Sequence, residues 1–304
     1  MTGSGTLYLQ DPTKFAIASI TGNYALHLSG PAAGQTGTAA IAAAFTATAG
    51  VLSAGKLDAS QGTTASANLA ATGAYSAPTS TTGRGTLTVV SPYGTQNLVY
   101  YLVDATRAVV VATDAGNTLR GDLVKQPAGP FTLGSYAGGY AMVVSGANAA
   151  SPVAVGAVFT LDGAGSVTSG TADVNTNGTA QNQVAIAGTY AVLDATTGRA
   201  EASLTINGQA RKFALYPEVS SVYTAIEIDG VQTTIGRAYL QASNVGSGSF
   251  SGTYAARLAG TDFVNSGEQD AVGILAPNGG SALTGTLAIN DNGTITLNVP
   301  ASAS

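Results

Sequence analysis

Residues 159–175, with the sequence FTLDGAGSVTSGTADVN, contain the pattern that decides the fold. Two runs of strand-forming residues flank the turn Asp162-Gly163-Ala164-Gly165, and aspartate and glycine are residues that turns favour. The whole chain has this character: 9% of its residues are charged, against roughly 25% in a typical soluble domain, and 40 of 304 are glycine. Because the composition suits strands and turns better than surface helices, we expect an all-β protein.

A repeat with a period near 115 residues organises the chain. A Gly-x-Tyr element places Tyr24, Tyr140 and Tyr254 at steps of 116 and 114 residues. A Gly-Arg dipeptide recurs at Arg84 and Arg199, 115 residues apart, and the closing segment Gly-x-x-x-x-Gln recurs at the same spacing. Such agreement at one spacing indicates duplication of a structural unit.

The phase of the repeat predicts four parts. Residues 5–10 match the closing segments 121–126 and 236–241, so they are interpreted as the orphan last strand of a repeat. The predicted parts are an N-terminal strand and linker (1–20), β-repeat 1 (21–130), β-repeat 2 (131–245) and a partial β-repeat 3 (246–304). In this interpretation the chain holds the last strand of one repeat, two whole repeats and the first half of another.

Each whole repeat contains about eight short strand signals separated by Gly, Pro, Asn and Asp turns. In the first of them Tyr24, Leu26 and Leu28 are expected to face inward, and Ala25 and His27 outward. The fold class is therefore predicted as all-β, with tandem small antiparallel β-barrels or β-sandwiches and a partial third repeat. A closed barrel is favoured because it leaves no exposed edge strands. A propeller is the alternative, because the Gly-x-Tyr element occurs twice in each unit.

Composition excludes several classes of function. The net charge is −5, and no basic stripe exists that would hold a phosphate backbone, so no nucleic-acid partner is expected. The absence of cysteine excludes disulfide and thiol chemistry. No apolar run approaches 18 residues, so no membrane span is expected. The first residues lack the features of a signal peptide, and we interpret the chain as the mature form of an extracellular or cell-surface bacterial protein.

One segment resembles the opening of a calcium-binding loop. Asp173, Asn175 and Asn177 alternate before a glycine, as oxygen ligands do in such loops, although Val184 occupies the position of the bidentate glutamate. The alternative is a hairpin turn, for which Asn-Gly is the preferred dipeptide. Calcium at these three residues is the one cofactor considered, and no other is expected.

Catalytic groups cannot be assembled from this sequence. The single histidine, His27, aligns with Val143 and Arg257, so a surface position is expected for it and a catalytic base is not. Arg84 and Arg199 each follow a glycine at the start of a strand and are expected to pair with a carboxylate of the same unit. Paired carboxylates of the glycosidase kind are not evident, so the protein is predicted not to be an enzyme.

The repeat unit as a whole resembles a known class of sequences. Its consensus runs from Gly-x-Tyr through Phe-Thr-x-Asp-Gly-x-Gly to a second Gly-x-Tyr, then Gly-Arg and a closing Gly-x-x-x-x-Gln. This resembles the tandem β-repeats of predicted secreted proteins from acidobacteria and related environmental bacteria. The resemblance implies export and an all-β fold, and it implies little about activity. In organisation the chain is also similar to donor-strand filament subunits, although it carries no pilin motif.

The leading functional hypothesis is structural: a subunit of an extracellular filament, sheath or surface layer, assembled head to tail with other copies by strand complementation. The residues expected at the subunit interface are Gly5, Thr6, Leu7, Tyr8, Leu9, Gln10, Ile295, Leu297 and Val299. One alternative is a secreted adhesin or polysaccharide-binding β-repeat protein, with extracellular polysaccharide as its partner. The other is a fragment of a longer repeat array.

Overall fold

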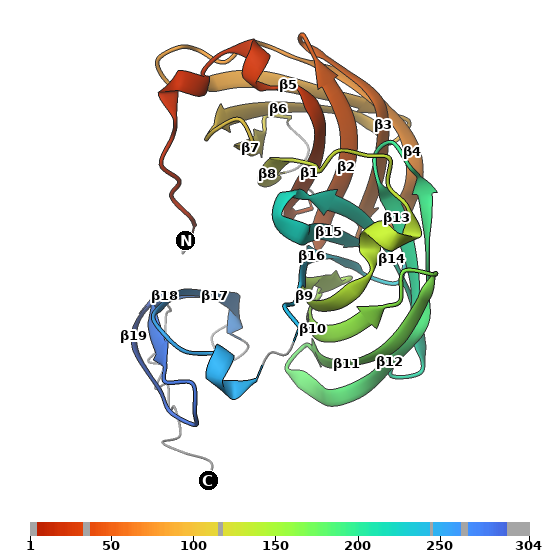
Figure 1. The fold of residues 1–304 in the computed structure, drawn as a ribbon, viewed down its shortest axis with the longest axis vertical. Coiled ribbons are helices and arrows are strands. Elements are labelled where there is room, and N and C mark those ends of the chain that lie inside the picture. Colours follow the sequence, from red (N-terminus) through yellow and green to blue (C-terminus); the bar gives the residue numbers. More distant parts are fainter. Residues whose placement is uncertain (1–4, 33–36, 115–117, 244–245, 263–266, 291–304) are drawn as a thin grey trace. The chain divides into compact units, whose positions relative to one another are not determined.

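The computed structural model describes residues 5–32, 37–114, 118–243, 246–262 and 267–290. It confirms the all-β prediction: two closed antiparallel barrels of eight strands follow one another along the chain, and a three-stranded sheet follows them (Figure 1). The chain divides into two compact units, of which Leu9–Gln241 contains both barrels and the other contains the three-stranded sheet.

Barrel 1 has the eight strands that the strand signals and turn residues of repeat 1 predict. They are β1 (Gly22–Pro31), β2 (Thr38–Thr48), β3 (Val51–Gln61), β4 (Thr64–Tyr75), β5 (Arg84–Ser91), β6 (Gly94–Leu102), β7 (Arg107–Ala112) and β8 (Arg120–Lys125). Each strand pairs with the next, and β8 pairs with β1, with Lys125 opposite Tyr24. Because consecutive strands close on themselves, the propeller alternative is wrong.

Barrel 2 repeats this topology. Its strands are β9 (Gly138–Asn148), β10 (Ser151–Leu161), β11 (Ser166–Thr176), β12 (Thr179–Asp194), β13 (Arg199–Ile206), β14 (Gln209–Glu218), β15 (Val222–Glu227) and β16 (Thr233–Leu240). The cross-strand pair Phe213 and Glu227 corresponds to Leu98 and Ala112 in barrel 1, so residues 115 positions apart are structurally equivalent here.

The tyrosines of the Gly-x-Tyr elements hold the connecting segments against the barrels. Short 3₁₀ turns occur at η1 (Pro12–Lys14), η2 (Ile17–Ser19), η3 (Leu133–Tyr136), η4 (Val219–Ser221) and η5 (Ser247–Ser249). The Tyr75 hydroxyl donates to the Ile20 carbonyl at 2.6 Å, and the equivalent Tyr190 donates to Leu133 at 3.2 Å. A buried tyrosine hydroxyl requires such a partner, so the motif fixes the linker that precedes each barrel.

Alternation along the strands builds the core of each barrel. Tyr24, Leu26 and Leu28 are buried inside barrel 1, as the size pattern predicts. Each fully buried apolar side chain of this size contributes about 1.5–3 kcal/mol relative to an exposed one. The same inward positions of β9 fill barrel 2, so each barrel has its own apolar core.

The third sheet contains β17 (Tyr254–Asp262), β18 (Gly267–Pro277) and β19 (Leu283–Asn290), in that order. Tyr254 pairs with Leu275 as Tyr140 pairs with Phe159, so these strands correspond to β9–β11. Tyr254 and Leu258 occupy inward positions but are 40% and 55% exposed, whereas Tyr140 is 2% exposed. Within the described residues, the face that would form a core is therefore open.

A glycine in the closing strand lets that strand lie against the first strand of its barrel. A Cβ at Gly121 would lie 1.7 Å from the His27 carbonyl oxygen, and one at Gly236 would lie 1.9 Å from the Val143 oxygen. The equivalent Gly5 has nothing within 4 Å of that position. Where the closing segment completes a barrel, its close approach to the first strand thus explains why this position is a glycine.

Replacing Gly236 by alanine is expected to lower the free energy of unfolding by about 2–3 kcal/mol, because the added methyl group overlaps a backbone oxygen. Gly156→Ala, in the same barrel, is the control: a Cβ there meets nothing within 4 Å. That variant should match or slightly exceed the wild type. Urea unfolding measures both, and equal losses in the two variants would contradict the explanation.

Candidate assembly interface between the barrels

The two barrels pack side against side through a contact that we call the joint. Outward residues of β1 and β2 meet outward residues of β14–β16 and of the turn after β15. The buried apolar members are Ala25, Ala40, Ala42, Ala44, Ala214, Tyr216, Ile226, Ile228 and Ile235. Alanine at every outward position of this patch on barrel 1 lets the two sheets approach closely.

A buried ion pair crosses the joint. The Arg199 guanidinium of barrel 2 donates to both carboxylate oxygens of Asp58 in barrel 1, from Nε at 2.7 Å and from Nη2 at 2.8 Å. Both side chains are fully buried. Bidentate hydrogen bonds between charged groups of this kind are stronger than those between neutral side chains.

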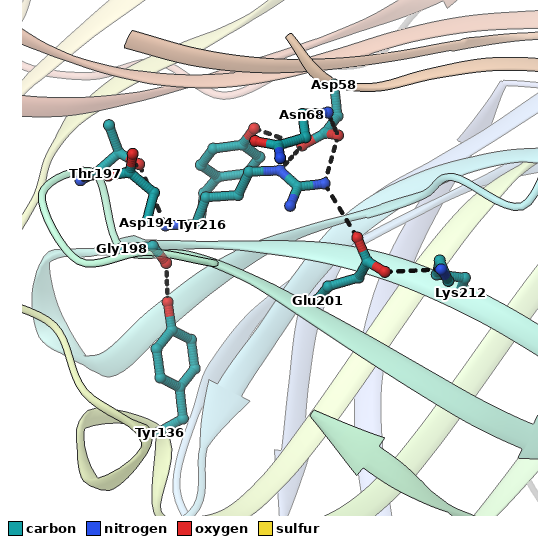
Figure 2. A network of polar contacts seen from close by, with 10 residues as sticks. Asp58, Asn68, Tyr136, Asp194, Thr197, Gly198, Glu201, Lys212 and Tyr216 are labelled. Carbon is teal, nitrogen blue, oxygen red and sulfur yellow. Dashed lines mark hydrogen bonds and ion pairs between the residues drawn. The ribbon is translucent and has the colours of Figure 1, made fainter. Parts of the chain in front are cut away.

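Further donors complete the shell of Asp58, as Figure 2 shows. The Tyr216 hydroxyl donates to Oδ2 at 2.5 Å and the Asn68 backbone N–H donates to Oδ1 at 2.7 Å. Burial alone would lower the pKa of Arg199, but hydrogen bonding and the charge of Asp58 outweigh it and raise that pKa above its usual value. Burial, followed by the charge of Asp58, raises the pKa of Tyr216 well above its usual value. Both groups therefore keep their protons, as hydrogen-bond donation to the carboxylate requires.

A second charged cluster lies at the same joint. Arg237 of barrel 2 donates from Nη2 to Asp122 of barrel 1 at 2.8 Å and from Nε to Glu218 at 3.1 Å. The hydroxyls of Ser60 and Thr233 also form a hydrogen bond across the joint, at 2.8 Å. Ionic and polar contacts thus surround the alanine patch and fix the orientation of one barrel on the other.

The closing glutamine of one repeat binds the next barrel. Gln126 donates from Nε2 to the carbonyl oxygens of Thr197 and Pro217, both at 2.9 Å. The Gln10 side chain donates an equivalent pair of hydrogen bonds, at 3.3 and 2.7 Å, to carbonyl oxygens of barrel 1. These acceptors lie 115 residues before Thr197 and Pro217 in the chain. Gln10 therefore contacts barrel 1 as Gln126 contacts barrel 2.

The predicted subunit-interface residues fall in two places. Residues 5–10 are not part of a strand in the described structure, and Leu7 and Leu9 are 100% and 96% exposed. Gln10 is held on barrel 1, as described above. Ile295, Leu297 and Val299 lie outside the described residues. Pairing of these segments between chains stays a prediction.

The calcium candidate lies on β11 and its turn. Asp173 Oδ1 accepts a hydrogen bond from the Gln183 N–H at 2.8 Å, and Asn175 Oδ1 accepts one from Gly178 at 3.0 Å. Asn177 has a φ of 52° in the hairpin turn. Among the described residues no group of three His, Cys, Asp or Glu is placed to hold a metal ion. Calcium binding there stays a prediction.

Asp173 is the structural equivalent of Asp58. The two aspartates lie 115 positions apart in the sequence. Each accepts a hydrogen bond from the backbone N–H of the residue ten positions later in the chain. The sequence predicts that Arg199 pairs with a carboxylate of its own unit, and Glu201 of that unit does lie 3.5 Å from Arg199 Nη2. The closer and bidentate partner is Asp58 of the preceding barrel, which the sequence did not identify as a partner. The Gly-Arg motif was the available signal, since it placed the arginine but not its partner.

The joint also covers His27, which the sequence predicted at the surface. Its side chain is half-buried, but Nδ1 is fully covered and has no hydrogen-bond partner. Burial, followed by the charge of Arg237, lowers the pKa of His27 to about 3, although Asp122 opposes the shift. The outward position on the strand was predicted correctly, and the neighbouring barrel covers part of the side chain, including Nδ1.

Replacing Arg199 by methionine is expected to cost about 3–5 kcal/mol, because it leaves the Asp58 carboxylate buried without its cation. Arg84→Met provides the matched control, because Arg84 occupies the same Gly-Arg position in barrel 1 but is exposed. The control should change stability by less than about 0.5 kcal/mol. Thermal and urea unfolding compare the two, and a similar loss in both would argue against the buried pair.

His27→Val is expected to flatten the pH dependence of stability on the acid side. The unfolded chain takes up a proton near pH 6.5 and the folded chain near pH 3, so stability is full above 6.5 and falls as the pH decreases between these values. The free energy of unfolding of the variant minus that of the wild type should be about 2 kcal/mol larger at pH 4.5 than at pH 8. Urea titrations across this range measure it, and parallel pH profiles would refute the assignment.

Comparison of the chain with protein-family models, with curated proteins and with solved structures gave no match. In the described part of the chain, no helix has the length and apolar character that crossing a membrane requires.

Proposed function

We propose that this protein is a structural subunit that assembles head to tail with other copies, through contacts that reproduce its own joint. The joint has two sides. The aspartate face is the outward side of β1–β3 with Asp58, and the arginine face is the outward side of β13–β16 with Arg199. Because each barrel is built on the same register, each has a version of both faces.

The unpaired arginine face belongs to barrel 1. Arg84, Tyr101 and Val111 are the equivalents of Arg199, Tyr216 and Ile226 at a spacing of 115 residues, and all three are exposed. In barrel 2 the same positions are buried against barrel 1. Exposed apolar residues beside a cation of this kind are typical of a protein-binding surface.

The unpaired aspartate face belongs to barrel 2. Asp173 is exposed there, and its Oδ1 is already oriented by the Gln183 N–H. Val143 and Val158 lie on the same outward face and are also exposed. This face complements the arginine face of barrel 1 in charge and in apolar character, and it is the observation that carries the proposal.

Contact between these two faces in different chains is heterologous. A heterologous contact that does not close into a ring produces a filament. The low charge of the chain and its likeness to secreted repeats support an extracellular filament, sheath or surface layer on a bacterial cell.

Strand complementation is a second candidate contact. Leu123 in β8 and Ala238 in β16 face inward beside the first strand of their barrels, and Leu7 occupies the same repeat position. By this register, residues 5–10 of one chain would pair with β17 of another, with Leu7 opposite Ala256. The third sheet carries Ala288 at the position of Asp58, so this contact would lack the buried ion pair.

Sedimentation velocity and electron microscopy of the full chain test the assembly. Arg84→Glu and Asp173→Arg are each expected to lower the association constant at least about tenfold, because loss of one partner from a buried charge pair costs about 2–5 kcal/mol. The double charge reversal should restore part of the loss. Lys14→Glu, a reversal at another exposed cation, is the control.

Two results would decide against parts of the proposal. A wild-type chain that stays monomeric up to its solubility limit would reject assembly altogether. If Leu7→Asp abolishes assembly while Arg84→Glu and Asp173→Arg leave it intact, strand complementation is the contact and the copied joint is wrong.

A further inference from the structure

The end of barrel 2 opposite η3 contains a cavity of about 230 Å³ that the joint does not use. Its polar lining includes Gln181, Asn207, Arg211, Glu227 and Gln232. Phe213, together with valine and isoleucine side chains, forms the apolar part of the wall. The cavity is smaller than the roughly 300–1,000 Å³ of typical ligand pockets, which favours a small ligand.

Glu227 is the central group of this cavity. It is fully buried, and its Oε2 accepts hydrogen bonds from Gln232 at 2.9 Å and from the Thr234 hydroxyl at 2.6 Å. Its Oε1 has no hydrogen-bond donor, and the nearest cation is Arg211 Nε at 3.6 Å. A buried carboxylate oxygen without a donor is costly, so a ligand hydroxyl that donates to it would be stabilised.

Barrel 1 shows that the fold does not require these charges. Gln96 and Ala112 occupy the positions of Arg211 and Glu227 in the same register. A residue as small and apolar as Ala112 therefore serves at this end of an otherwise equivalent barrel. Burial of a carboxylate costs energy that only its interactions recover, so the presence of this pair in barrel 2 points to a role other than folding.

The charges of the cavity point to a neutral ligand. Arg211 lies between Glu227 and Asp229, whose Oδ2 is 4.0 Å from the Arg211 guanidinium. A bound anion would meet the Glu227 carboxylate, and a bound cation would meet the Arg211 guanidinium. The amide side chains supply both donors and acceptors, which is the requirement of a molecule rich in hydroxyl groups.

We propose that this cavity binds a monosaccharide-sized neutral sugar, either free or as the end of a longer glycan, with hydroxyls donating to Glu227 Oε1 and accepting from Arg211. The apolar wall at Phe213 would cover the hydrophobic face of the ring. This function is separate from assembly, because none of these residues contributes to either face of the joint.

The titration of Glu227 offers a second readout. Burial raises the pKa of Glu227 to about 7, although hydrogen bonds from Thr234 and Gln232 oppose the shift, Asp229 adds to it and Arg211 opposes it. A sugar hydroxyl that donates to Oε1 favours the carboxylate form. Binding should therefore be tighter at pH 8.5 than at pH 5.5.

Saturation-transfer NMR and calorimetry on the full chain test the proposal. The probes are D-glucose, D-galactose, D-mannose and N-acetylglucosamine, their β-linked trisaccharides, and phosphate and ethanolammonium as charged comparisons. At least one sugar should bind saturably and more tightly than either charged probe, and the trisaccharide arm separates free sugar from chain-end recognition. Glu227→Gln and Arg211→Gln should each weaken binding about tenfold or more, and Gln96→Ala in barrel 1 should not.

Three results would overturn the proposal: no sugar binds saturably, a charged probe binds more tightly than every sugar, or both cavity variants bind like wild type. The unfolding midpoint of each variant is measured in parallel, so that a folding defect is recognised. Glu227→Gln removes the charge without changing the shape of the side chain. Because the side chains of Glu227 and Arg211 line the cavity and do not cross the joint, assembly should be unchanged in both variants, so failure here leaves the assembly proposal standing.

Discussion

The placement of one barrel on the next depends on the Asp58 carboxylate being accepted into the joint. Removing a carboxylate and a guanidinium from water costs several kcal/mol for each ion, so such a pair persists only when almost every lone pair and proton is satisfied. The Asp58 carboxylate accepts two hydrogen bonds from Arg199, a third from Tyr216 and a fourth from the Asn68 backbone, whereas Arg199 Nη1 is buried without a partner. A misplaced joint would leave these charges buried and unpaired. The pair therefore contributes less to net stability than to selecting one relative orientation of the barrels.

The surface of barrel 1 at the joint is nearly flat, because its outward side chains are small. Outward alanines on β2, such as Ala42, allow two curved sheets to come within contact distance over several strands. Larger residues there would hold the sheets apart and admit water to the ion pair, which would weaken it by raising the local dielectric. Small side chains and buried charges are thus parts of a single arrangement. The equivalent face of barrel 2 carries Val143 and Val158 with Asp173, and is the version that remains exposed.

Most of the fold could be predicted from the sequence, because turns and side-chain alternation are local signals. The eight strands of barrel 1 and the inward positions of Tyr24 and Leu26 follow from such signals. The joint could not be predicted, since Asp58 and Arg199 are 141 residues apart and belong to different units. His27 was misjudged for the same reason: its strand was assigned correctly, and the barrel that covers it has no signature near it in the sequence. The cavity charges at Arg211 and Glu227 break the repeat, and a position-by-position comparison of the two units would have found them.

The pairing of β1 with β8 has a mechanical consequence. Tyr24, near the start of β1, lies opposite Lys125 at the end of β8, and Tyr140 lies opposite Leu240 in the same way in barrel 2. The chain therefore enters and leaves each barrel at one end, on neighbouring strands. Tension along the chain would pull these strands apart one hydrogen bond at a time, like a zipper, instead of shearing all of the bonds together. Tension carried through the side-to-side joint would bypass this weak point, so a barrel held by its joint would resist stretching that would open a barrel held only by its linkers.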